Sequence, residues 1–245
     1  MEDKIFTSNI KRKIEHSEKY YTTMHTEFLD PAQIALSQPL LLGVPHIFEG
    51  GYEEAERKVL FIMPDEYTEP DIDDTVCVIR ISVSGNKPLS HRDYLGSVLG
   101  LGIRRDRIGD LIVYENGCDM VVLEEISGYI LQNLTKIARQ NAKCVKRSLK
   151  ELRRAKVEYE EETLIVSSLR LDCVISASYN LSRKDAADKI NADRVQVNHT
   201  VCNNISKTVS QGDTISLRGG GRFKLESIDG TTKKGRTVIT IIKPK

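Results

Sequence analysis

The stretch RLDCVISASYNLSRKDAADKINADRVQVN, residues 170–198, decides the fold of the C-terminal third of the chain. Apolar residues that begin at Leu171 recur at helical spacing, which predicts one short helix. Ser182 is a residue type that caps helices, and the run from it to Ile190 predicts a second helix. The alternation in Val195–Val197 predicts a strand. These residues therefore specify two short helices packed on a small sheet.

Basic residues gather on this segment. Arg183 and Lys184 directly follow the predicted cap at Ser182, where the free N–H groups of a helix N-terminus favour phosphate oxygens. The cations are expected to hold phosphates, and Ser182 and Asn198 to fix backbone or sugar contacts. The alternative for each cation is a solvated surface charge, and for Asn198 a turn residue. The expected RNA-binding residues are Arg170, Ser182, Arg183, Lys184, Arg194, Asn198, Arg222 and Lys224.

Two further features follow in the sequence. Residues 219–221 are three glycines, which let the backbone approach a ligand closely. Lys233, Lys234 and Arg236 form a basic turn before a closing strand at residues 238–242. A basic hairpin tip is common without any ligand, so the turn is a weaker indication of binding than the helical segment.

The net charge of +1 conceals an uneven distribution of charge. Residues 1–135 carry a net charge of −10, residues 136–156 of +8, residues 157–166 of −4 and residues 167–245 of +7. The second basic block coincides with the predicted helices. A neutral total therefore does not exclude a polyanionic partner, and the asymmetry favours one.

Composition bounds the class of protein. Hydrophobic residues make up 40% of the 245 residues and charged residues 29%, which is typical of a soluble globular chain with two or three small domains. The apolar runs are too short for a membrane span, and no secretory signal is expected. The five cysteines contain no C-x-x-C pair and the five histidines no metal spacing, so neither a disulfide framework nor a metal site is expected.

The middle of the chain has the order of a ferredoxin-like or RRM-like domain, β-α-β-β-α-β. Its two central strands carry no aromatic residue on which an RNA base could stack. A structural or protein-binding role is therefore favoured, although His91, Arg92, Arg104, Arg105 and Arg107 could hold phosphates rather than form a solvated face. The predicted elements are strands at residues 76–83, 111–114, 118–123 and 143–149, and helices at residues 90–99 and 124–139.

The fold class predicted for the whole chain is α+β in three parts. Residues 1–70 form a small, mostly helical domain, with Asp30 and Pro31 starting one helix and a buried strand at residues 59–63. Residues 71–166 form the RRM-like domain with its linker, the linker having some strand character. Residues 167–245 form the C-terminal domain.

The C-terminal motifs resemble the alpha-L RNA-binding domain of the ribosomal protein S-four type. The resemblance covers about the last eighty residues and implies docking on folded RNA. Asp193 departs from the pattern, which usually has Gly there, so we expect Asp193 in the left-handed region. The motifs are Arg170-Leu171-Asp172, Ser182-Arg183, Ala186-Ala187, Ile190, Val195-Gln196-Val197-Asn198 and Gly212-Asp213-Thr214-Ile215.

The chain as a whole resembles the YlmH family. The resemblance implies a cytoplasmic RNA-binding protein that binds ribosomal RNA and tRNA on the large ribosomal subunit carrying a stalled peptidyl-tRNA. There the family supports ribosome-associated quality control and tailing of the nascent chain, and it is also associated with cell division. We expect a monomer. The motifs are Phe28-Leu29-Asp30-Pro31, Gly50-Gly51-Tyr52, Ala55-Glu56-Arg57, His91-Arg92-Asp93-Tyr94-Leu95-Gly96-Ser97, Ile108-Gly109-Asp110, Ser168-Leu169-Arg170-Leu171-Asp172 and Arg218-Gly219-Gly220-Gly221-Arg222.

Catalysis is not expected, and neither is a cofactor. A pseudouridine synthase needs a large catalytic domain, and Asp172 fits the start or cap of a helix better than a catalytic aspartate. A methyltransferase needs a Gly-rich strand-to-helix turn, whereas a strand follows residues 219–221. His91-Arg92-Asp93 is similar to the catalytic loop of a kinase. However, no Asn lies five residues beyond Asp93, and no Gly-rich nucleotide-binding loop precedes the motif. The alternatives that stay open are a protein-interaction scaffold linked to cell division and a non-enzymatic relative of RNA-modifying enzymes.

Overall fold

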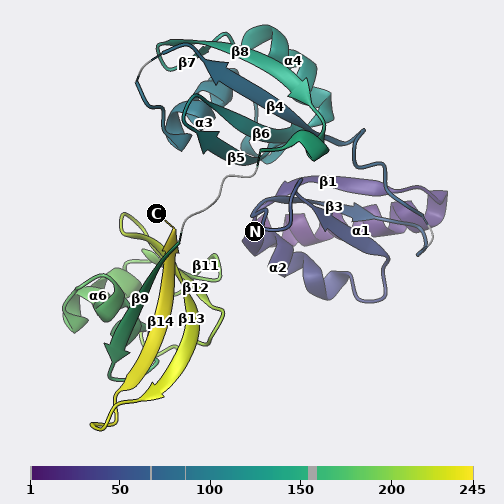
Figure 1. Cartoon of the computed structure of the whole chain (residues 1–245). Helices are drawn as coiled ribbons and strands as arrows, with labels where there is room; N and C mark the ends of the chain where they lie inside the picture. Colours follow the sequence, from purple (N-terminus) through teal and green to yellow (C-terminus); the bar gives the residue numbers. More distant parts are fainter. Residues whose placement is uncertain (1, 67, 86, 154–158, 245) are drawn as a thin grey trace. The chain divides into compact units, whose positions relative to one another are not determined.

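The computed structural model describes residues 2–66, 68–85, 87–153 and 159–244. The chain divides into two compact units, Met1–Ala155 and Lys156–Lys245 (Figure 1). Helix and sheet are mixed in both, which confirms the predicted α+β class. The predicted boundary at residue 70 falls inside the first unit, and the one at residue 166 lies beyond the division between the units.

The N-terminal part of the first unit contains more strand than the sequence predicts. Its strands form an antiparallel sheet in the order β1-β3-β2. The mostly helical prediction is wrong for β1 and β2, because both are short and gain their hydrogen bonds only by pairing with β3. The elements are α1 (Glu2–Tyr20), β1 (Met24–Leu29), α2 (Pro31–Ser37), the 3₁₀ turn η1 (Gln38–Leu40), β2 (His46–Glu49) and β3 (Lys58–Ile62).

The helix predicted to start at Asp30 and Pro31 is present as α2, and α1 precedes it. The α1 stripe buries Ile10 against Leu29 and Leu60. At the start of α2, the Gln33 amide donates to Asp30 Oδ1 and the Asp30 amide to Gln33 Oε1, both at 2.9 Å. This reciprocal cap is the one that the Asp-Pro-x-Gln spacing predicts.

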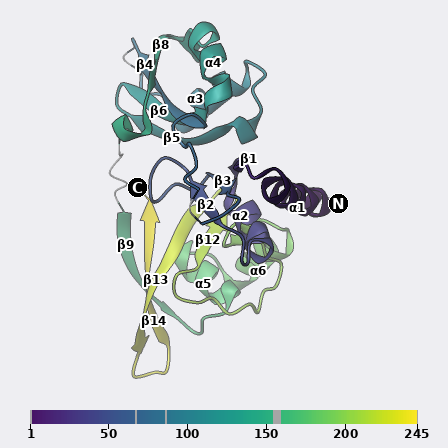
Figure 2. The ribbon, with the colours of Figure 1, turned by 90° about the vertical axis from the view of Figure 1, so that its right-hand side faces the viewer.

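The middle of the first unit has the predicted RRM-like order. Its antiparallel strands lie in the order β5-β6-β4-β8-β7, and α3 and α4 lie on one face of them (Figure 2). The helices pack on that face through Tyr94, Val98 and Ile130. The elements are β4 (Val76–Val83), α3 (His91–Leu99), η2 (Arg105–Arg107), β5 (Ile108–Tyr114), β6 (Gly117–Leu123), η3 (Glu124–Ile126), α4 (Ser127–Asn133), β7 (Lys136–Ile137), β8 (Gln140–Arg147) and η4 (Leu149–Glu151).

The second predicted helix of this domain is too long. After α4 ends at Asn133, Lys136 and Ile137 pair with Asn141 and Gln140. Ile137 continues the apolar spacing of the helix because its side chain is buried. It is buried on the short strand β7, however, and not on a helix.

The helix-free face of the RRM-like sheet is covered over part of its area. Val121 and Leu123 of β6 pack with Phe28 of β1 and with Val59 and Phe61 of β3. In a typical RRM the bases of RNA stack on this face. The missing aromatic residues therefore reflect a face that serves as a hydrophobic core inside the first unit.

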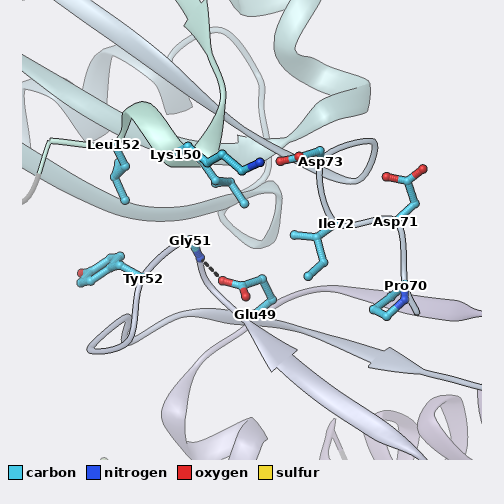
Figure 3. Close-up of a pocket in the computed structure, with 10 residues that line it drawn as sticks. Glu49, Gly51, Tyr52, Pro70, Asp71, Ile72, Asp73, Lys150 and Leu152 are labelled. Atoms are coloured by element: carbon cyan, nitrogen blue, oxygen red, sulfur yellow. Dashed lines mark hydrogen bonds between the residues drawn. The ribbon is translucent and has the colours of Figure 1, made fainter. Parts of the chain in front are cut away.

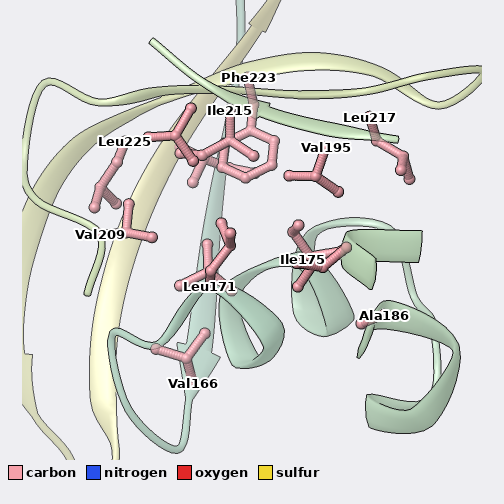
Figure 4. Packing of buried hydrophobic residues seen from close by; sticks show 14 of the residues in the cluster. Val166, Leu171, Ile175, Ala186, Val195, Val209, Ile215, Leu217, Phe223 and Leu225 are labelled. Atoms are coloured by element: carbon pink, nitrogen blue, oxygen red, sulfur yellow. The ribbon is translucent and has the colours of Figure 1, made fainter. Parts of the chain in front are cut away.

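The C-terminal unit is a twisted antiparallel sheet, in the order β11-β10-β12-β13-β14-β9, with α5 and α6 packed on it. Leu171 and Ile175 of α5 and Ala186 of α6 meet Ile215 and Phe223 of the sheet in one core (Figure 4). The elements are β9 (Tyr159–Val166), α5 (Leu171–Ser178), α6 (Arg183–Asn191), β10 (Val195–Val197), β11 (Thr200–Val201), β12 (Thr214–Leu217), β13 (Gly221–Thr231) and β14 (Thr237–Pro244).

The segment assigned to a linker of the middle domain is a strand of the C-terminal sheet. β9 pairs with β14 along its whole length, from Tyr159 opposite Pro244 to Val166 opposite Thr237. Glu162, Leu164 and Val166 are the less exposed residues of the strand, and this alternation is what the pairing requires. The central part of the predicted linker, residues 154–158, lies outside the described residues.

Candidate nucleic-acid interface

A buried carboxylate joins two of the predicted RNA-binding residues. Asp172 lies in the first turn of α5, and its side chain is 6% exposed. Oδ1 accepts a hydrogen bond from Arg170 Nε at 3.1 Å, and Oδ2 accepts one from Arg183 Nη2. The side chains of Arg170 and Arg183 are 43% and 56% exposed. The two guanidinium groups are therefore held together at the surface by an anion beneath them.

The electrostatics keep this cluster ionised. Burial alone would raise the pKa of Asp172, but the hydrogen bonds from Arg183 and Arg170 outweigh it and lower the pKa of the carboxyl. The same bond to Asp172 raises the pKa of Arg183. Two cations around one anion leave a net positive charge, and each guanidinium keeps donors that Asp172 does not use. Such a group suits the oxygens of a phosphodiester.

The start of α6 is built as the sequence predicts. Ser182 Oγ accepts a hydrogen bond from the amide of Asp185 at 3.0 Å and lies 2.7 Å from Asp185 Oδ2. Ser182 therefore acts as the helix cap, and its hydroxyl is engaged inside the protein rather than directed at a sugar. Arg183 and Lys184 follow in the first turn, both exposed.

Arg194 lies at the other end of α6. Its Nη2 donates to the carbonyl of Arg218 at 3.1 Å, and the Arg218 amide donates to the carbonyl of Arg194 at 2.8 Å. Because α6 has nine residues, its two ends lie about 13 Å apart. The predicted residues thus fall into separate groups on the unit, one at the start of α6 and one at its end.

The glycine run has a structural cause. Residues 218–220 form the turn between β12 and β13. Gly219 within it has φ +87°, and Gly221, the first residue of β13, has φ +93°. The Tyr179 hydroxyl donates to the carbonyl of Gly221 at 2.9 Å. The hydrophobic surroundings raise the pKa of Tyr179 to about 12, so this hydroxyl stays a donor. The turn explains the glycines without a ligand.

Asn198 is a turn residue, the alternative that the sequence left open. Its amide nitrogen donates to Asp213 Oδ1 at 2.8 Å, and its oxygen accepts from the Thr214 amide at 2.9 Å. Asn198 has φ +49°. Asp193 has φ +53°, which confirms the left-handed conformation expected where the pattern usually has Gly.

Arg222 and Lys224 lie on β13, on the side of the strand opposite the buried Phe223 and Leu225. Lys224 Nζ lies 2.9 Å from Glu226 Oε2, an exposed ion pair. An acidic neighbour offsets the charge of Lys224, so Lys224 is a weaker candidate for phosphate contact than Arg183.

Three of the basic residues that the sequence singles out in the middle domain, Arg104, Arg105 and Arg107, are engaged within the first unit. Arg105 donates to the carbonyls of Ile108 and Gly109, and burial lowers its pKa to about 10. Arg104 pairs with Asp106, and Arg107 with Glu125. These bonds favour a structural role for the three arginines over phosphate binding.

The motifs that the resemblance uses in the first unit converge on Asp110. Its carboxylate accepts from the Tyr52 hydroxyl at 2.9 Å and from the amide of Glu56 at 2.7 Å. Arg57 Nη2 donates to the carbonyl of Phe28 at 2.9 Å, and Arg57 Nε to that of Ile108 at 3.2 Å. These residues fix β1, the segment before β3, and β5 to one another.

A cavity of about 530 Å³ opens in the first unit between residues 49–52, 70–73 and 149–152 (Figure 3). Glu49, Asp71 and Asp73 line it, with Lys150. Glu49 Oε1 accepts a hydrogen bond from the Gly51 amide at 2.5 Å. Three carboxylates against one ammonium repel phosphate, so this cavity does not suit an RNA backbone.

Sequence reasoning missed one residue of the C-terminal site, Asp172. The sequence predicts that Asp172 starts or caps a helix, which is correct. Its two arginine partners depend on how α5 packs beside α6, and no local pattern encodes that contact.

The described part of the chain contains no helix long and apolar enough to cross a membrane. Within the same residues, no group of three or more His, Cys, Asp or Glu side chains is arranged to hold a metal ion.

Comparison with known proteins adds two domain assignments. The family described as the putative RNA-binding domain in YlmH matches residues 74–151, and the S4 domain matches residues 169–215. The chain is 29% identical over 231 residues to the ribosome-associated protein quality control protein P2 of Bacillus subtilis (strain 168), which covers 93% of this chain and 90% of that protein. The structure of the cell division protein ylmH from Streptococcus pneumoniae matches with a TM-score of 0.54 at 24% identity, over 62% of this chain and 94% of that one, which supports the fold.

Proposed function

The chain is a YlmH-type RNA-binding protein with a C-terminal S4 domain, and on that basis we propose that it acts in ribosome-associated quality control of stalled nascent chains. It binds the large ribosomal subunit that carries a peptidyl-tRNA, through ribosomal RNA and tRNA, and works as a monomer in the cytoplasm. The name of the Bacillus subtilis relative supports the assignment to quality control.

One observation carries this proposal. In the S4 domain, Arg170 and Arg183 are held by Asp172 with their side chains about half exposed. Lys184 is exposed beside Arg183. Such a surface binds RNA through its phosphates, and its affinity falls steeply with salt because each bound phosphate displaces counterions.

Sedimentation of the full chain with ribosomes tests the proposal. The variant Arg183→Glu, Lys184→Glu should leave the large-subunit fractions of a density gradient. The control Lys233→Glu, Lys234→Glu changes the charge of the same unit equally, at the tip of the β13–β14 hairpin, and should stay in those fractions. Unchanged sedimentation of the first variant contradicts the site. Equal loss of both contradicts it too, because binding would then follow total charge.

The finer part of the proposal concerns the RNA that is touched. Ultraviolet crosslinking of the full chain in cells, followed by RNA sequencing, should recover both large-subunit ribosomal RNA and tRNA. Recovery of ribosomal RNA without tRNA contradicts contact with peptidyl-tRNA.

We further propose that the protein has no catalytic activity of its own on RNA. The carboxylate of Asp172, the candidate by sequence for a catalytic aspartate, is engaged by two arginines. Incubation of the purified chain with tRNA and ribosomal RNA, followed by mass spectrometry of the nucleosides, should show no new modification. Any modified nucleoside that depends on the protein contradicts this part.

A further inference from the structure

We propose that Asp172 is a positioning residue, which aligns Arg170 and Arg183 as a two-sided clamp for the phosphate oxygens of one segment of RNA backbone. The inference rests on the proposed function, because it assumes that this surface binds RNA. It assigns a role to a negatively charged side chain in a site whose ligand is itself negative.

The geometry supports alignment rather than simple charge. Each oxygen of Asp172 accepts from a different arginine, Oδ1 from Arg170 and Oδ2 from Arg183. Arg170 lies at the start of α5 and Arg183 at the start of α6, eleven residues from Asp172. A free arginine side chain samples many rotamers, and fixing it on binding costs conformational entropy. Two arginines already held by a buried carboxylate avoid part of that cost.

A clamp requires a buried carboxylate and exposed guanidinium groups, and the three side chains have this arrangement. Asp172 is 6% exposed, whereas Arg170 and Arg183 are 43% and 56% exposed. The carboxylate is therefore shielded from a ligand on the surface, while the guanidinium groups are open to it. Each arginine uses one nitrogen on Asp172 and keeps its other donors for a phosphate.

A purely structural role is the competing explanation. A carboxylate in the first turn of a helix stabilises that helix, and the bond to Arg183 ties α5 to α6. Both effects change the free energy of unfolding. Neither changes the affinity of the folded protein for RNA in the direction that the clamp predicts, and this difference decides the experiment.

The test compares the affinity of full-chain variants for purified large ribosomal subunits, measured at several salt concentrations. Asp172→Asn removes a negative charge from a surface that binds a polyanion, so charge alone predicts tighter binding. The clamp predicts weaker binding, about tenfold, because the amide cannot accept from both arginines. Asp172→Glu keeps the charge but moves it by one methylene, and should bind with an affinity between those of the wild type and Asp172→Asn. Asp188→Asn, on the exposed side of α6, is the matched control and should not weaken binding.

The outcomes separate the inference from the proposed function. The affinity order wild type, then Asp172→Glu, then Asp172→Asn, with no loss of affinity in Asp188→Asn, supports the clamp. Equal or tighter binding by Asp172→Asn with its unfolding midpoint intact overturns it. If Asp172→Asn does not fold, Asp172→Glu decides, since wild-type affinity of that variant also overturns the clamp. The double variant Arg170→Ala, Arg183→Ala tests the RNA site itself, because its unchanged binding removes the proposed interface whatever Asp172 does.

Discussion

Arg80 holds Asp119 with two parallel hydrogen bonds across the β4–β6 pair, from Nε at 2.8 Å and from Nη2 at 2.7 Å. Asp119 is fully buried, and it also accepts from the Tyr114 hydroxyl at 3.1 Å and the Arg153 amide at 2.9 Å. Every oxygen of this carboxylate is thus satisfied inside the first unit. Asp119 lies two residues before Val121 on β6, so the pair lies on the helix-free face of the RRM-like sheet.

Removing one partner of this pair should destabilise the first unit strongly. Asp119→Asn leaves Arg80 with an uncompensated charge, and we expect a loss of about 3–5 kcal/mol in the free energy of unfolding. Urea denaturation followed by circular dichroism measures it. Asp188→Asn, an exposed aspartate on α6, should change the same quantity by less than about 0.5 kcal/mol. Equal midpoints for the two variants would contradict the role of the pair.

Acid should unfold the protein through its paired carboxylates. Burial opposes ionisation of Asp119, but the bonds from Arg80 and Arg153 outweigh it and lower its pKa. A lowered pKa in the folded state contributes stability above the unfolded value, near 4, which is lost as pH falls through the folded pKa. Unfolding midpoints should therefore stay level from pH 7 to about 5 and fall below pH 4. Asp119→Asn should flatten that fall, and an unchanged slope would exclude Asp119 as its source.

Two glycine substitutions should have opposite effects. A Cβ on Gly109 would lie 2.7 Å from Cε1 of Phe28, whose ring is fully buried, so Gly109→Ala should cost about 1–3 kcal/mol by overpacking. A Cβ on Gly96, in the middle of α3, meets no atom within 4 Å. Gly96→Ala should stabilise by up to about 1 kcal/mol, because alanine is the better helix former. Thermal unfolding of the pair checks this, and a stable Gly109→Ala protein would contradict the close packing at Phe28.

The covered face of the RRM-like sheet should contribute to stability and not to RNA affinity. Val121→Ala removes two methyl groups from a fully buried site and should cost about 2 kcal/mol. Val201→Ala, with the valine 51% exposed, is the matched control and should cost little. Filter binding to large ribosomal subunits should give the same affinity for both folded variants. A selective loss with Val121→Ala would place RNA on this face.

The elements that the sequence predicted well are those specified locally. In α5 and α6 the apolar spacing, the cap at Ser182 and the following turn all lie within a few residues of one another. The same is true of the Asp30 cap and the β5–β6 hairpin. Strands β1 and β2 are missed because neither shows a regular alternation of buried and exposed residues, and β9 is misassigned because its partner β14 lies at the other end of the C-terminal unit. Tyr159, for example, pairs with Pro244, and no local pattern encodes that partner.

The candidate site shows the same difference between features that are specified locally and features that depend on distant partners. The sequence predicts Arg183 and Lys184 as phosphate-binding residues because charge and helix start coincide there, and their binding role stays a prediction. The roles of Asn198 and Ser182 depend on side-chain partners, Asp213 and Asp185, that compete with any ligand. The association of Arg170 with Arg183 depends on a carboxylate between two helices. Sequence spacing gives the residue types of such a site, and packing decides which of them meet.

The pairing of β9 with β14 decides which fragment of the chain contains the complete C-terminal sheet. A fragment that begins at residue 167 lacks β9 and leaves β14, with its alternating Ile239 and Ile241 facing the core, as the open edge of the sheet. An exposed, β-branched edge invites pairing with other chains. In the intact unit the outer strand instead carries Glu160, Glu161 and Glu162, whose like charges repel a second copy. We therefore expect the acidic strand to limit self-association of this basic unit, and a fragment meant to stay soluble should include it.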